Sequence, residues 1–191
     1  ANILPQDQEA LEYLIFHASL RADLKPEWLQ LFSNESAWKN WVFGASALQK
    51  SKPAEAIPYF EKFLSDPSPS AAQKRYQDHA WILLGQAHFA NHAFTKSALA
   101  FQNVKKSSNK LSQALSDLSW AYLQGEKYSD AIGAGIGMFT GSLKRTFTPE
   151  IPMVMAMSFN ELCLFPEALK SVSAYRKHYE ADHQWLSQEL S

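Results

Sequence analysis

Two histidines at helical spacing are the first residues in this sequence that could do chemistry. His88 and His92, in the segment HFANH, are four residues apart. On a helix they would share one face, as two metal ligands do. No third ligand is evident nearby, and the glutamate of a zinc-protease motif is missing. We therefore expect His88 to be a packing residue and His92 a turn residue, and we predict neither a metal nor a cofactor.

A glycine-rich segment is the second candidate. GAGIGMFTG contains Gly133, Gly135 and Gly137 and looks like a phosphate-binding loop. A dinucleotide fingerprint must follow a strand and open a helix, whereas this segment lies inside an expected helix. The glycines therefore predict close backbone packing or a distorted helix.

The single cysteine is the third candidate. Cys163 could be a nucleophile only beside a convergent histidine in an activating environment, and the segment NELCLF contains no motif that would supply one. We expect a buried thiol at a helix end. No catalytic residue is predicted, and the chain is expected not to be an enzyme.

The composition describes the elements that must position these residues. Hydrophobic residues make up 46% of the 191, and there are only 7 glycines, which favours a helical chain with an ample core. Eighteen basic and nineteen acidic residues give a net charge of −1, so we expect no nucleic-acid partner. No apolar run approaches the roughly 20 residues that span a bilayer, so no direct membrane insertion is expected. Because the chain begins at Ala1, we expect a processed or shortened protein.

A sequence repeat explains the intervals around His88. The stretch from Trp81 to Val104 returns 34 residues later, with Ser119 in the place of Gly85. Looser copies lie upstream and downstream, at spacings of 41 and 37 residues. Small residues recur where two helices of a pair would cross closely. They are Gly44, Gly85, Ser119 and Ala156 in the first helices, and Ala56, Ser97, Ala131 and Ala168 in the second helices.

The repeated pattern resembles the tetratricopeptide repeat, with its W-x2-L-G-x2-Y motif over 34 residues. The resemblance implies an all-α fold of about ten helices, an α-solenoid of antiparallel helix pairs in a right-handed superhelix. Residues 1–34 are expected to form helices that pack on or cap the array. The repeats are expected at about 35–68, 78–111, 112–145 and 149–180, followed by a C-terminal helix within 35–191.

Tetratricopeptide proteins are protein-binding scaffolds whose first helices line a concave groove. The resemblance assigns that groove to Trp38, Trp41, Leu48, His79, Ile82, Gln86, Phe89, Trp120, Leu123, Met153, Met157 and Asn160. A carboxylate clamp is not expected, because Trp41 or Ile82 stands in the place of its lysine and Gln86 or Trp120 in the place of its asparagine. An apolar segment or helix of another protein or peptide is the expected partner, with the aromatic residues as anchors.

A second hypothesis is an assembly role in a larger complex. The N-terminal helix, apolar on nearly all sides between Leu11 and Leu20, would then fill the groove, and open solenoid ends would allow oligomers. The segments PEIPMVMAM and FNELCLFPEAL resemble tetratricopeptide proteins of bacterial cell envelopes. The resemblance favours a periplasmic or envelope location, with the cytoplasm as the alternative.

Overall fold

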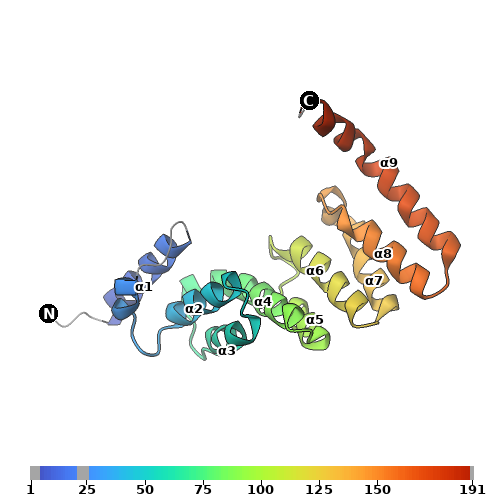
Figure 1. The fold of residues 1–191 in the computed structure, drawn as a ribbon. Coiled ribbons are helices and arrows are strands. Elements are labelled where there is room, and N and C mark those ends of the chain that lie inside the picture. Colours follow the sequence, from blue (N-terminus) through green and yellow to red (C-terminus); the bar gives the residue numbers. More distant parts are fainter. Residues whose placement is uncertain (1–4, 21–25, 190–191) are drawn as a thin grey trace. The chain divides into compact units, whose positions relative to one another are not determined.

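The computed structural model describes residues 5–20 and 26–189 (Figure 1). All regular secondary structure in these ranges is helical, and no strand occurs there. The all-α prediction is confirmed. The elements are α1 (Pro5–Ser19), η1 (Pro26–Leu31), α2 (Ala37–Gln49), α3 (Pro53–Leu64), α4 (Ala71–Ala90), α5 (Phe94–Gln102), α6 (Leu111–Gln124), α7 (Tyr128–Met138), η2 (Gly141–Arg145), α8 (Glu150–Glu161) and α9 (Phe165–Glu189), where η marks a 3-10 helix.

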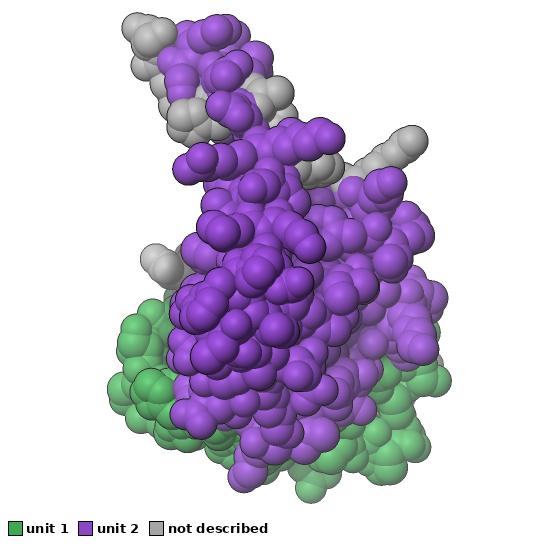
Figure 2. Space-filling view, turned by 90° about the vertical axis from the view of Figure 1, so that its right-hand side faces the viewer, with its two compact units in different colours: residues 1–93 green, residues 94–191 purple. Residues whose placement is uncertain are grey.

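The helices belong to two compact units, residues 1–93 and 94–191 (Figure 2). The division falls between α4 and α5, inside the repeat expected at 78–111. In unit 1, α3 packs against both α2 and α4, and α1 packs against α2. In unit 2, every helix from α5 to α9 packs against the next one along the chain. Consecutive helices are therefore the packing partners within each unit.

Four turns of one geometry separate the first helix of each expected repeat from the second. The residues Ser51, His92, Glu126 and Cys163 all have φ between 56° and 59°, the left-handed region. In each turn the next amide donates to a carbonyl five residues back, as Lys52 N does to Ala47 O at 2.9 Å. This is the Schellman motif that ends a helix. Its recurrence supports the repeat register independently of the side chains.

Close approaches between helices explain the recurring small residues. Gly44 in α2 is buried, and a Cβ there would lie 2.9 Å from Cζ of Phe60 in α3. The reciprocal position, Ala56, is fully buried, and so are Ser97 and Ala131. In the last pair, Ala156 and Ala168 are only half-buried.

Two boundaries differ from the sequence-based expectation. Helix α4 begins at Ala71, inside the loop expected before residue 78, because Ser70 and Gln73 form a capping box. The C-terminal residues expected to form a further helix are the end of α9, which is a continuous helix of 25 residues. Pro53 and Pro166 stand in the first turns of α3 and α9, where proline is tolerated because the first amides of a helix have no partner within it.

Candidate functional site

The structure sorts the twelve predicted groove residues by how accessible they are. Trp38, Trp41, Ile82 and Leu123 are buried; Leu48, His79, Gln86, Phe89 and Trp120 are half-buried; Met153, Met157 and Asn160 are exposed. The exposed members all lie on α8. This helix is therefore where the predicted surface is open.

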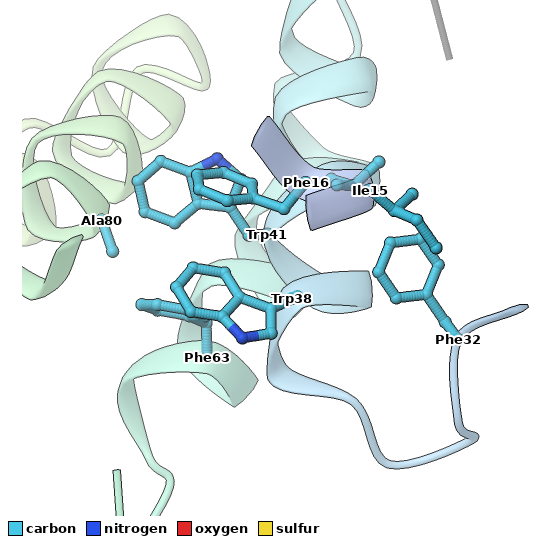
Figure 3. Packing of buried hydrophobic residues seen from close by; sticks show 8 residues of the cluster. Ile15, Phe16, Phe32, Trp38, Trp41, Phe63 and Ala80 are labelled. Carbon is cyan, nitrogen blue, oxygen red and sulfur yellow. The ribbon is translucent and has the colours of Figure 1, made fainter. Parts of the chain in front are cut away.

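Trp38 and Trp41 belong to the core of unit 1 rather than to an accessible groove, which corrects their assignment as partner anchors in this conformation. Each is 1% exposed. Phe16 of α1 stacks on Trp38 with ring centroids 4.7 Å apart and meets Trp41 edge-on at 5.6 Å, and Phe63 of α3 packs against both (Figure 3). The physical reason is that α1 and α3 supply aromatic rings to a surface too apolar to remain in water.

A buried carboxylate fixes α1 in this position. Glu12, only 4% exposed, accepts hydrogen bonds from Ser33 N at 2.7 Å, Ser36 Oγ at 2.6 Å and Gln8 Nε2 at 2.9 Å. Burial raises the pKa of Glu12, but these hydrogen bonds outweigh it, so the pKa lies below its ordinary value. Ser36 also caps α2 by accepting from Lys39 N. Glu12 thereby joins α1 to the start of the first helix pair.

His17 adds a second polar link in unit 1. Its Nε2 lies 3.0 Å from the hydroxyl of Tyr76 in α4, and the same tyrosine ring meets Phe16 edge-on at 4.9 Å. Helix α1 is therefore bound to both α2 and α4. No sequence signal identified these partners, because Glu12, His17 and Tyr76 carry no motif.

In unit 2, Leu123 is also part of a core. It packs with Ala131 and Val154, and Trp120 lies half-buried against the same cluster. These residues fill the space between α6, α7 and α8. Leu123 cannot contact a partner in this conformation, whereas Trp120 keeps a partly exposed edge.

The open surface is a hollow between α8 and α9. We call it the α8–α9 hollow; its volume is about 510 Å³, and its lining is Pro149, Glu150, Pro152, Met153, Ala156, Met157, Val172 and Tyr175. Two of these residues, Met153 and Met157, are one helical turn apart on α8 and 49% and 43% exposed. Across from them, Val172 and Tyr175 of α9 are each 42% exposed. Apart from Glu150 the lining has no charge.

One helix that lines the hollow is much longer than the other. Helix α8 has 12 residues and α9 has 25, so at 1.5 Å per residue α9 is longer by roughly 20 Å. Figure 1 shows its C-terminal half extending beyond α8. Trp185 and Leu186 on that half are 60% and 47% exposed. Exposed apolar side chains are thus also present on α9 beyond the hollow.

His88 and His92, which suggested a metal site, occupy a packing position and a turn position. His88 is buried in α4, as predicted for a packing residue, and His92 is exposed at the turn that follows. No group of three or more His, Cys, Asp or Glu residues that could hold a metal occurs in the described ranges.

Cys163 is exposed, so the prediction of a buried thiol was wrong. It stands at the left-handed position of the turn between α8 and α9. The glycine-rich segment lies inside α7, where Gly135 makes the predicted close approach while Gly133 and Gly137 face open space.

None of the helices in the described part of the chain is both long and apolar enough to cross a bilayer.

Comparisons with known proteins found no matching family model and no matching curated protein. Among solved structures, a crystal structure of MamA matches 96% of this chain and 99% of its own, with a TM-score of 0.66 and 16% sequence identity. At that identity the likeness shows the fold alone. The fold is a tetratricopeptide-like α-solenoid of antiparallel helix pairs.

Proposed function

We propose that this chain is a non-catalytic protein-interaction scaffold, and that a partner helix or extended apolar segment binds in the α8–α9 hollow. The observation that carries the proposal is a difference between equivalent positions. Three residues before the small residue of each first helix stand Trp41, Ile82, Ser116 and Met153. The first three are buried and Met153 is exposed.

The chemistry of the hollow suits a protein segment. Methionine side chains are flexible and polarizable, so they adapt to irregular apolar partners. Tyr175 offers a large apolar ring with a polar tip, a residue type enriched at interfaces. The volume of about 510 Å³ accommodates a few anchoring side chains of a helix laid along α8 and α9. Exposed apolar clusters of this kind mark interaction surfaces in water-soluble chains.

A selection experiment tests the proposal. A library of displayed helical peptides would be selected against the intact protein, and each binder would be tested against Met153→Glu/Met157→Glu. We expect most binders to lose at least tenfold in affinity, because two carboxylates would be buried without partners. Ile136→Glu is the matched control, since Ile136 in α7 is 51% exposed and lies outside the hollow. Binders that tolerate the double substitution as well as the control would contradict the proposal.

The alternative function, an assembly subunit whose groove is filled internally by the N-terminal helix, has its own supporting observation. Phe16 covers Trp38 and Trp41 in unit 1. Phe16→Asp should free α1 and make these tryptophans accessible to acrylamide, whereas Leu14→Asp, at a position 64% exposed, should not. Equal quenching of the two variants and the wild type would show that α1 is not the cover. The bacterial envelope location remains a prediction.

A further inference from the structure

A second recess beside α9 has a different chemistry. Two adjoining hollows of about 330 Å³ and 320 Å³ share Phe139, Pro152 and Ala174. We call them together the lysine trough. Met155 and Phe159 of α8 extend the apolar floor of the first hollow. The trough lies between α9 on one side and α8 with the end of α7 on the other.

Positive charge surrounds this apolar floor. Lys170 and Lys177 line the trough from α9, and Lys144 lines it from η2. The acidic residue among the lining is Glu167, whose carboxylate is 3.9 Å from Lys170 Nζ in a solvent-exposed pair. Within the described ranges, Lys144 and Lys177 are in no ion pair. The lining therefore has a net positive charge, with lysines from α9 and from η2, although the whole chain has a net charge of −1.

We propose that the lysine trough binds an acidic, apolar segment of another protein, with aliphatic or aromatic side chains on the floor and carboxylates facing Lys170 and Lys177 on α9 and Lys144 on η2. The trough follows α9 from Glu167 to Tyr179, which is roughly 18 Å at 1.5 Å per residue. That length fits about twelve helical residues or about five extended ones.

The spacing of the cations defines the segment further. Lys170 and Lys177 are seven residues apart on one helix, or about 10 Å along its axis. A helical partner would meet them with acids at i and i+7, which lie on one face about two turns apart. Complementary charge on the rim would speed association and select the partner, while the apolar floor would supply affinity. Pro152 lines both the trough and the α8–α9 hollow, while the other lining residues differ, so different substitutions test the two proposals.

Labelled synthetic peptides test the proposal by fluorescence anisotropy at low and high salt. The acidic probe has about twelve residues of Leu, Phe, Ala and Glu with glutamates at i and i+7; a second probe has Lys in place of every Glu, and a third has Gln. We expect the acidic probe to bind most tightly and to weaken with salt. Lys144→Glu/Lys177→Glu should weaken binding of the acidic probe about tenfold and strengthen binding of the lysine probe. Each exposed ion pair contributes a modest free energy of binding, and reversing a charge replaces that attraction with repulsion.

Controls separate this surface from other causes. Lys50→Glu/Lys62→Glu makes the same charge change at exposed lysines outside the trough and should leave affinity unchanged apart from a small salt-sensitive shift. Ala174→Trp would fill the shared floor and should block all three probes, while Met153→Glu/Met157→Glu should not. Equal affinity for acidic and lysine probes, or no effect of the trough substitutions, would overturn the proposal. Self-association in analytical ultracentrifugation that Lys144→Glu/Lys177→Glu abolishes would assign the trough to a second copy of this chain instead.

Discussion

Substitution of two glycines of α7 provides a test of how tightly the last three helices pack. A Cβ on Gly135 would lie 2.7 Å from Cγ of Met155 and 3.3 Å from Cγ2 of Ile151, both on α8. A Cβ on Gly133, two residues earlier on the same helix, would meet nothing within 4 Å. Both positions are helical. Replacing either by alanine therefore brings the same gain in helix propensity and differs only in packing.

The magnitudes follow from these distances. Glycine to alanine in a helix interior adds about 0.5–1 kcal/mol to the free energy of unfolding. Gly133→Ala should show that gain. Gly135→Ala should show the same gain minus an overpacking cost of about 1–3 kcal/mol. We expect the lower half of this range, because Met155 is half-buried and can change rotamer, whereas Ile151 is fully buried and cannot move aside.

Urea unfolding followed by far-ultraviolet circular dichroism measures the difference, which should be about 1–2 kcal/mol between the two variants. The chain has two compact units, and Gly133 lies in unit 2. If the units unfold in separate transitions, the unfolding transition that Gly133→Ala shifts is therefore that of unit 2. Met155→Ala added to Gly135→Ala should recover part of the loss, since it removes the clashing atoms, and a double-mutant cycle isolates that coupling. Equal stability of the two glycine variants, or no coupling to Met155, would refute the packing described for α7 and α8.

Three further results are expected. Gly44→Ala should lower the unfolding free energy of unit 1 by about 1–2 kcal/mol in urea titration, because the new Cβ would meet the buried ring of Phe60 at 2.9 Å. Ser51→Gly should raise it by about 1 kcal/mol, because φ of 56° suits glycine, whereas Lys50→Gly at φ −83° should lower it. The lowered pKa of Glu12 stabilises the folded state above the unfolded pKa and the gain is lost as pH falls through the folded pKa. Glu12→Gln should flatten this acid dependence of stability, and an unchanged pH profile would refute the role of Glu12.

The repeat pattern of the sequence was enough to predict the fold because one physical constraint recurs in it. Two helices can cross closely only where the facing residues of both are small. Gly44 and Ala56 are such residues, and small residues recur at the equivalent positions of the other repeats. Prolines near helix starts, such as Pro53 and Pro166, are a further signal of where the second helices begin. The turn residues gave no such signal. Left-handed positions favour glycine or asparagine, whereas this chain has Cys163 at one of them, so the exposure of that thiol was hard to predict.

The candidate site was less predictable, since accessibility depends on what covers a helix as well as on its own register. The sequence placed Trp41 and Met153 at equivalent positions. It also indicated that the N-terminal helix needs burial on more than one side. Which helix pair that segment covers depends on contacts such as those of Phe16 and Glu12 with residues of α2 and the segment before it. Contacts between segments that are far apart along the chain produce no periodic pattern in the sequence.

The residue types at these equivalent positions fit two kinds of occupancy. Trp41 is a rigid ring held by aromatic neighbours on several helices, including Phe16, Phe60 and Phe63. Such a residue stabilises one permanent arrangement, because displacing any neighbour leaves a large cavity. Met153 has no such enclosure, and its flexible side chain can be covered and uncovered with little strain. We infer that the N-terminal helix permanently buries the apolar surface of the first helix pair, whereas the surface of the last pair stays accessible for a partner that binds reversibly.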